Sequence, residues 1–209
     1  MIYYEKVELK NGKEMIIRNA DYNDGKAVHD LFIETHQQTD YLLTYVDEFT
    51  FDELKESFYL ERKKESDRAV ELLAVIDGKV VGASGIDPIG NKYKIKHRCD
   101  FGISILKEYW GLSIGYLLTE AAIKCAKEMG YSQIELQVVS ENSSAIALYK
   151  KTGFVEFGRI PQGFISRYGG PQAVILMYKK LDWDWRVPLV FLDFSSPILG
   201  VLFSLLGTQ

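Results

Sequence analysis

Residues 109–118 read Tyr-Trp-Gly-Leu-Ser-Ile-Gly-Tyr-Leu-Leu and join an expected strand to an expected helix. Glycine at positions 111 and 115 allows a tight turn and a close approach of the backbone to a ligand. The first amide groups of the following helix have no acceptor within that helix, and the helix dipole favours a negative charge there. The segment predicts a phosphate or diphosphate loop, although packing alone could also require its glycines.

Two common phosphate-binding patterns are absent from the sequence. It contains neither G-x-x-x-x-G-K-[ST] nor G-x-G-x-x-G after a first strand. A nucleoside-triphosphate loop and a dinucleotide-binding fold are therefore poorly supported. A phosphate site at residues 109–118 would belong to another class.

The segments after the loop alternate between helical and strand-like patterns. An apolar stripe at helical spacing predicts a helix ending before Gly130, and a second helix stops at Gly153. Strands are indicated by alternating apolar residues. The expected elements are helices at about 114–129 and 143–152, and strands at 133–139, about 154–160 and about 173–180.

The segments before the loop predict two hairpins, two helices and a strand. Asn11-Gly12 and Asp77-Gly78 are typical of tight hairpin turns. Thr50 is the expected N-cap of the second helix, with Glu53 three residues further on. The elements are expected at residues 3–9 with 14–18, 72–76 with 80–86, about 21–40, about 51–64 and about 94–105.

This order of elements indicates an α/β fold with a mixed sheet. The strands before and after the helix at about 114–129 should be parallel, and the crossover between them should be right-handed. The hairpins contribute antiparallel strands.

A second motif follows in residues 142–154, which read Asn-Ser-Ser-Ala-Ile-Ala-Leu-Tyr-Lys-Lys-Thr-Gly-Phe. Its Asn, Ala-Ile, Leu-Tyr and Gly-Phe, together with the loop, resemble the GNAT superfamily of N-acetyltransferases. The earlier segments at 17–20, 77–82 and 101–105 match in the same order, so the resemblance covers roughly residues 14–182. It implies a mostly antiparallel mixed sheet with a splayed central parallel strand pair and flanking helices. We expect one N-acetyltransferase domain at 1–182 and an apolar extension at 183–209.

The resemblance implies acetyl-CoA as a cosubstrate, held in the opening between the splayed strands. Free backbone groups of the earlier strand would bond the pantetheine amides, as an added strand would. The implied cofactor-binding residues are Ile103, Ile105, Trp110, Gly111, Leu112, Ser113, Ile114, Gly115, Asn142 and Tyr149. Asn142 could equally cap the helix that follows it.

The loop departs from the family pattern [Gln/Arg]-x-x-Gly-x-[Gly/Ala] at two positions. Trp110 replaces the Gln or Arg, and Ser113 replaces the central Gly. Both changes leave the backbone N–H donors in place, and the Ser113 hydroxyl could add a further hydrogen-bond donor to a phosphate. The Cβ atom of Ser113 is a difficulty only if this position needs a positive φ.

Tyr149 matches the family's general acid, which protonates or hydrogen-bonds the departing CoA thiolate. Without the surrounding motif it would be interpreted as a core aromatic. The base that takes the proton from the amine is open between Glu135, Asp100 and His97. Some relatives carry Glu where this chain has Gln137, and glutamine cannot be a base.

The sequence therefore predicts an acyl-CoA-dependent N-acyltransferase that moves an acetyl group from acetyl-CoA directly to a primary amine. The acceptor would be a small molecule or a peptide. The walls of the acceptor site are expected in residues 41–49, which are rich in aromatics and carboxylates, and in the turn 167–171. The alternative is a non-catalytic CoA-binding regulatory module.

The composition limits the partners and the location. A formal net charge of −4 gives no global attraction for nucleic acid. No metal site is expected, because the histidines and cysteines lack ligand spacing, and the two cysteines fit a reducing cytoplasm. Residues 187–207 are apolar, close to the length that spans a bilayer, but Pro188, Asp193 and Pro197 interrupt them. We expect this tail to pack on its own domain or in a homodimer; a membrane contact and a loose tail are the alternatives.

Overall fold

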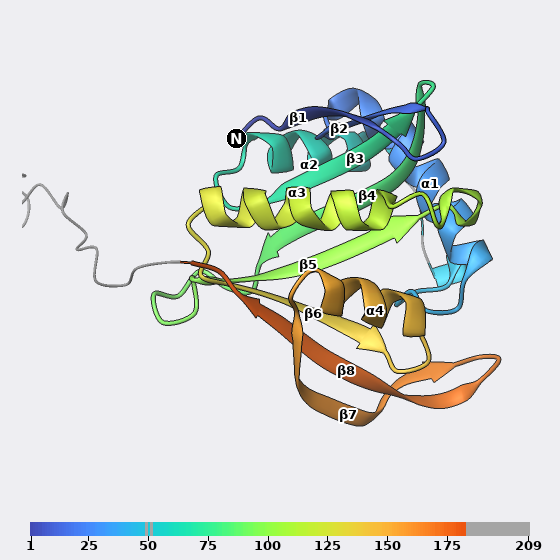
Figure 1. Ribbon diagram of the computed structural model, residues 1–209, viewed down its shortest axis with the longest axis vertical. Helices are drawn as coiled ribbons and strands as arrows, with labels where there is room; N and C mark the ends of the chain where they lie inside the picture. The colour runs from blue at the N-terminus through green and yellow to red at the C-terminus, as the bar shows by residue number, and fades with distance from the viewer. Residues whose placement is uncertain (49, 51, 183–209) are drawn as a thin grey trace, which may run out of the picture.

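The computed structural model describes residues 1–48, 50 and 52–182, and its strands form one eight-stranded sheet (Figure 1). The strand order is β1-β2-β3-β4-β5-β6-β8-β7. The strands are β1 (Tyr4–Glu8), β2 (Glu14–Asn19), β3 (Val70–Ile76), β4 (Lys79–Pro88), β5 (Arg98–Ile105), β6 (Gln133–Val139), β7 (Val155–Ser166) and β8 (Gly170–Lys180).

Helices cover both faces of the sheet. The α-helices are α1 (Gly25–Gln38), α2 (Glu53–Glu65), α3 (Ile114–Glu128) and α4 (Ser143–Lys151). Figure 1 shows α3 and α4 in front of the sheet and α1 and α2 behind it. The side of α3 that faces the sheet is buried and consists of small and branched apolar residues, including Leu118, Ala121 and Ala122. Their size allows the helix to pack closely on the strands.

The expected fold class is confirmed. Every strand pair is antiparallel except β5 with β6, which is parallel. The parallel ladder is short and joins only Arg98–Asp100 to Gln133–Glu135. Beyond it β5 stays paired with β4 as far as Ile105, while β6 stays paired with β8 as far as Val139. The two central strands therefore separate after Asp100 and Glu135.

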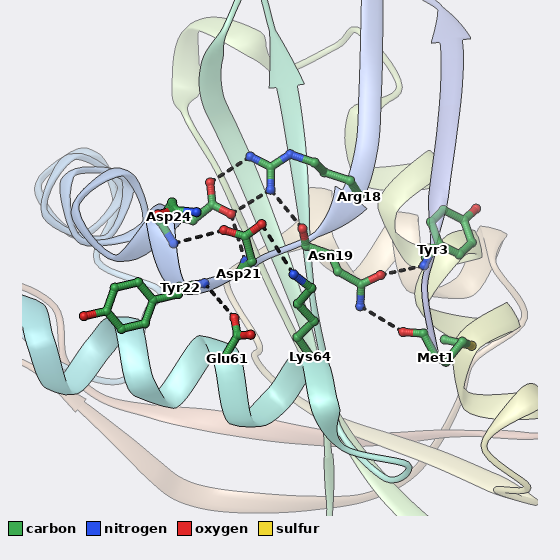
Figure 2. Close-up of polar contacts among 10 residues, drawn as sticks. Met1, Tyr3, Arg18, Asn19, Asp21, Tyr22, Asp24, Glu61 and Lys64 are labelled. Carbon is green, nitrogen blue, oxygen red and sulfur yellow. Dashed lines mark hydrogen bonds and ion pairs between the residues drawn. The ribbon is translucent and has the colours of Figure 1, made fainter.

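A polar cluster behind the sheet fastens the start of α1 (Figure 2). Arg18 on β2 donates two hydrogen bonds to the carboxylate of Asp24, at 2.6 and 2.7 Å. Asp24 also accepts the backbone amide of Asp21, at 2.9 Å. Lys64 on α2 forms an ion pair with Asp21 at 3.6 Å. The far end of α1 lies beside the end of β5, where the Oε1 atom of Gln38 accepts the amide of Lys107 at 2.7 Å.

Three local predictions were wrong. Asp52, not Thr50, caps α2, because its side chain accepts the amide of Lys55. The strand expected from residue 94 begins at Arg98, since the amides of Ile95 and Lys96 bond the carbonyl of Lys92 and form a turn. The strand expected at 154–160 continues to Ser166 through irregular pairing between Ile160 and Phe164.

Candidate active site

A cavity of about 380 Å³ lies where β5 ends, α3 begins and α4 passes. It brings together every predicted cofactor-binding residue except Leu112. These are Ile103, Ile105, Trp110, Gly111, Ser113, Ile114, Gly115, Asn142 and Tyr149. The end of α1 and the chain after it form another wall, with Thr35, Thr39, Tyr41 and Leu42.

The loop presents a run of unpaired backbone amides. Within the described residues, no amide from Gly111 to Tyr116 donates a hydrogen bond, whereas the next one, of Leu117, bonds the carbonyl of Ser113 at 3.0 Å. Such consecutive N–H groups at a helix start carry partial positive charge and need an acceptor. A diphosphate would supply several acceptor oxygens at once.

The edge of β5 that faces β6 is also open. The amide of Leu106 bonds the carbonyl of Val81, and the amide of Ile89 bonds the carbonyl of Arg98. Hydrogen-bonded pairs alternate along an antiparallel ladder, so the even-numbered residues of β5 bond β4 and the odd-numbered ones face β6. The N–H and C=O groups of Ile103 and Ile105 consequently point into the opening between the strands.

Trp110 makes a contact that the sequence did not predict. Its indole Nε1 donates a hydrogen bond to the carbonyl of Ile105, at 2.9 Å. That carbonyl is thus already engaged, and Ile103 with the amide of Ile105 provides the free groups of this edge. The ring of Trp110 remains half-exposed and lines the cavity. The residue that replaces the family's Gln or Arg therefore braces the loop against the strand.

Ser113 has the positive φ that makes its side chain costly. Its φ and ψ are 69° and 8°, in the left-handed region, and its hydroxyl makes no capping bond to the helix. A left-handed conformation costs a residue with a Cβ atom about 1–2 kcal/mol. The loop therefore stores strain where the family pattern has glycine.

We expect Ser113→Gly to stabilise the fold by about 0.5–1 kcal/mol, because it removes this strain at some cost in chain entropy. Gly111→Ala is the matched opposite change. The φ of Gly111 is 80° and a Cβ atom at this position would have no neighbour within 4 Å, so strain alone should lower stability. Urea unfolding midpoints measure both. Equal midpoints for Ser113→Gly and the native chain would contradict the strain at this position.

Tyr149 is a buried ring with a phenol that reaches the cavity. The ring packs edge-on to Phe101, with centroids 6.2 Å apart, and against Phe154 at 5.9 Å. Among the described residues the phenol oxygen has no hydrogen-bond partner. Burial raises the pKa of Tyr149 to about 12, so the phenol keeps its proton at neutral pH. It is both a core aromatic and a proton-bearing group facing the cavity.

Asn142 caps α4, as one of its two interpretations predicted. Its Oδ1 accepts the amide of Ala145 at 3.2 Å and the hydroxyl of Ser144 at 3.1 Å. The side-chain nitrogen makes no hydrogen bond within the described chain, and the residue lines the cavity. Capping therefore leaves the side-chain NH2 group, with its two N–H donors, for a ligand.

Three carboxylates stand in a row on the opposite face of the sheet from Phe101. Asp87 pairs with Asp100 across β4 and β5, and Asp100 pairs with Glu135 across β5 and β6. Lys63 binds the first, with Nζ to Oδ2 at 2.7 Å. Arg98 binds the last through two hydrogen bonds, one of 2.7 Å. Asp100, in the middle, has no hydrogen bond or ion pair with another side chain within the described residues.

The row distinguishes two of the three candidate bases, Glu135 and Asp100. Burial opposes ionisation of Glu135, but hydrogen bonds from Arg98 and Gln133 outweigh it and lower the pKa of this carboxyl. Desolvation, together with the charges of Asp87 and Glu135, raises the pKa of Asp100 to about 6, although the residue stays exposed to solvent. A carboxylate that titrates near neutrality is better suited to accept a proton. Neither residue lines the cavity on the side of Tyr149.

The two expected acceptor walls are joined to each other. Arg167 forms an ion pair with Asp47 at 2.8 Å and lies 4.0 Å from the ring centroid of Tyr45. The Tyr45 hydroxyl accepts the amide of Arg167 at 2.7 Å and donates to Asp40 at 2.9 Å. Ser166 hydrogen-bonds the same Asp40. Phe49, also expected in this wall, lies outside the described residues.

A family model and several known proteins match this chain. The model of the Acetyltransferase (GNAT) family matches residues 28–154. The chain belongs to the GNAT acetyltransferase family. An N-alpha-acetyltransferase of Sulfurisphaera tokodaii is 32% identical over 73% of this chain and 87% of its own length. The L-amino acid N-acetyltransferase AaaT of Escherichia coli is 29% identical over 68% and 83%.

Solved structures of similar fold support the same family. A GNAT-family acetyltransferase from Streptococcus pneumoniae has a TM-score of 0.76 and 29% identity, over 80% of this chain and 99% of its own. The structure of yncA from Salmonella typhimurium, with its cofactor acetyl-CoA, has a TM-score of 0.73 and 19% identity, over 84% and 98%. This GNAT chain is an acyl-CoA-dependent acetyltransferase, and its family uses acetyl-CoA as donor. Membership of this family disfavours a purely regulatory CoA-binding module.

Proposed function

We propose that this GNAT protein transfers an acetyl group from acetyl-CoA directly to a primary amine. The observation that carries the proposal is the continuity of the cavity. Unpaired amides at 111–116 lead to the open edge of β5 at Ile103 and then to the free phenol of Tyr149. A diphosphate, an amide-containing arm and a thioester need these three kinds of group in this order.

Each end of the donor has a physical partner in the cavity. The loop amides and the Ser113 hydroxyl would hold the diphosphate, and the donor nitrogen of Asn142 lies on the same wall. The backbone of Ile103 and the amide of Ile105 would bond the pantetheine arm as a neighbouring strand would. Acetyl-CoA supplies an activated acyl group when bound there.

Tyr149 would act as a hydrogen-bond donor to the charge that develops on sulfur. A thiol has a pKa of about 8.5, well below the value of about 12 for this phenol. Complete proton transfer from Tyr149 to a free thiolate is therefore uphill. A preorganised hydrogen bond in a dry cavity still stabilises the developing charge.

Asp100 would accept the proton of the attacking amine, directly or through a water molecule. It is the free carboxylate of the row, and it lies where β5 and β6 begin to separate. A water molecule in the opening between the two strands would relay the proton from the cavity. Lys63 and Arg98 neutralise its two neighbours, so Asp100 is the group of this row that can take up a proton near pH 6.

The acceptor would be a small-molecule or peptide amine that enters past the end of α1. Tyr41 and Thr39 reach the cavity from that side. The names of the two matched relatives concern an L-amino acid and an N-alpha amine. We therefore infer that α-amino groups of amino acids and peptide N-termini are the first acceptors to test.

The experiment measures CoA thiol release with acetyl-CoA and a panel of free amino acids, peptides with free or blocked N-termini, and diamines. We expect turnover with at least one α-amine and none with its N-blocked form. CoA binding without turnover on any amine would instead support a binding module. An acceptor acetylated on oxygen or sulfur would contradict amine transfer.

We expect Trp110→Phe to raise KM for acetyl-CoA about three- to tenfold and to leave kcat nearly unchanged. The variant loses the hydrogen bond to Ile105, worth about 1 kcal/mol, and with it the brace between loop and strand. Steady-state kinetics at saturating amine separate the two constants. A fall in kcat at constant KM would place Trp110 in the chemical step.

A further inference from the structure

Gln38, the last residue of α1, is hydrogen-bonded to the chain that leads into the diphosphate loop. Its Oε1 atom accepts the amide of Lys107 at 2.7 Å. Lys107 begins the short 3-10 helix η3 (Lys107–Tyr109), and Leu106, which precedes it, provides no side-chain cap. The first amides of a helix need an acceptor from outside that helix. Gln38 therefore supplies, from another element, the cap that η3 lacks.

The chain that follows α1 forms one wall of the cavity, and we call it the acceptor segment (residues 39–48). Within the described residues, the backbone hydrogen bonds of this segment stay inside it. The amide of Tyr45 bonds the Glu48 carboxylate at 2.7 Å, and the amide of Glu48 bonds the carbonyl of Tyr45 at 3.0 Å. Three of its residues line the cavity: Thr39, Tyr41 and Leu42. Side-chain contacts with the rest of the fold therefore set the position of this segment.

The hairpin of β7 and β8 holds the acceptor segment on one side. The Tyr45 hydroxyl accepts the amide of Arg167 at 2.7 Å and donates to Asp40 at 2.9 Å. Ser166, which is buried, hydrogen-bonds the same Asp40. On the other side the segment is held where it leaves α1, by the bond from Gln38 to η3.

The helix η3 passes directly into the amides that would bind the diphosphate. Trp110 follows η3, and its indole Nε1 bonds the carbonyl of Ile105 at 2.9 Å. The unpaired amides begin at the next residue, Gly111. A diphosphate bound there would fix the loop, and through η3 it would fix the contact of Gln38. A ligand that orders a shared element lowers the entropy cost of ordering it for a second ligand.

We propose that Gln38 is a positioning residue that couples the two substrate sites, because it fixes the acceptor segment when acetyl-CoA occupies the loop. The proposal rests on the proposed acetyl transfer for the identity of its acceptor. Coupling of this kind is reciprocal, so a bound amine strengthens acetyl-CoA binding by the same factor. A single hydrogen bond corresponds to a change of about two- to tenfold in affinity.

A second link between α1 and η3 is weaker. The Lys79 Nζ lies 3.5 Å from Glu34 on α1 and 3.4 Å from Glu108 on η3. All three side chains are half-exposed or more, and water screens such pairs so that they contribute little. The coupling therefore depends mainly on Gln38.

The test compares Gln38→Met with two other variants. Methionine keeps the length of the side chain and removes the acceptor oxygen, whereas Gln38→Glu keeps an acceptor for the Lys107 amide. Gln37→Met is the matched control, since Gln37 is exposed and makes no side-chain hydrogen bond within the described residues. Quenched-flow hydrogen exchange follows residues 39–48 with and without CoA. We expect CoA to slow this exchange in the native chain, Gln38→Glu and Gln37→Met, but not in Gln38→Met.

Kinetics give a second measurement with the α-amine that the native chain accepts. In Gln38→Met the KM for the amine should rise about two- to tenfold with little change in kcat, and Gln38→Glu should restore most of the native KM. A purely structural role would instead lower the melting temperature and change kcat and both KM values together.

Three results would overturn the proposal: no effect of CoA on exchange of residues 39–48 in the native chain, native slowing in Gln38→Met, or an equal loss in Gln37→Met. Calorimetric titration with CoA and thermal melting verify that each variant binds and is folded. The full chain is used, with the apolar extension at 183–209 that lies outside the described residues. Within the described chain, no helix has the length and apolar character needed to cross a membrane. Because exchange is measured with CoA alone, the coupling can hold even if no amine is acetylated.

Discussion

Tyr149→Phe should lower kcat about 100-fold and leave the affinity for acetyl-CoA nearly unchanged. The substitution removes only the phenol oxygen, so the packing of the ring on Phe101 and Phe154 remains. A hydrogen bond to a charged group contributes about 1.5–3 kcal/mol, which corresponds to a factor of about 10 to 150. Single-turnover thiol release and calorimetric titration with CoA measure the two effects separately.

Tyr116→Phe is the matched control for this variant. Tyr116 lines the same cavity from α3, and its ring lies 4.9 Å from the Lys151 Nζ, a contact that phenylalanine keeps. We expect near-native kcat. Because the pKa of Tyr149 is about 12, the native rate should show no alkaline fall from this group below about pH 11. Equal rates for Tyr149→Phe and the control would remove the phenol from the reaction.

Asp100→Asn should lower kcat/KM about 100-fold above pH 7, in the range typical of a lost general base. The useful quantity is the ratio of native to variant rates as a function of pH, because the protonation of the acceptor amine cancels in it. Asp100 must be ionised to accept a proton, and its pKa is raised to about 6. The ratio should therefore fall as the pH drops below about 6 and stay constant above about 7.

Glu135→Gln, on the neighbouring strand β6, is the matched control for Asp100→Asn. It makes the same change of charge, but its carboxylate is held by Arg98 and has a lowered pKa. We expect little change in rate and a loss of stability, since Arg98 loses its partner. Asp100→Glu should restore part of the activity. A pH-independent ratio for Asp100→Asn, or a larger rate loss in Glu135→Gln, would assign the base elsewhere.

The pH dependence of folding stability gives an independent test of the raised pKa of Asp100. Its folded pKa lies above its ordinary value of 3.8, so the folded state binds more protons between about pH 4 and 6. The ionised carboxylate therefore opposes folding, and this effect grows as the pH rises through that window. Asp100→Asn should be more stable than the native chain at pH 7 and equal to it near pH 3.

The sequence predicted those parts of the site that depend on local pattern. The loop at 109–118, the strand ends and the helix after Asn142 are specified by glycine positions, apolar periodicity and a capping residue, all properties of neighbouring residues. The same reasoning failed at Thr50, because Asp52 offered an equally good cap two residues later. It also failed at residue 94, where a turn competed with a strand.

Other features depend on residues that are distant in sequence. The choice between Asp100 and Glu135 follows from Lys63 on α2 and Arg98 on β5, whose partners only the sheet register defines. The strain at Ser113 and the bond from Trp110 to Ile105 are properties of backbone angles and of loop closure. Pattern analysis has no access to such contacts, because they follow from the path of the chain in space.

The candidate site shows the same division most clearly. By itself the sequence determined the GNAT family, and it predicted a diphosphate loop at residues 109–118 with Tyr149 near the thioester. Only the tertiary structure set Asp87, Asp100 and Glu135 side by side on one face of the sheet. Periodicity and motifs act over a few residues, whereas charge neighbourhoods are made by strands that meet from distant parts of the chain.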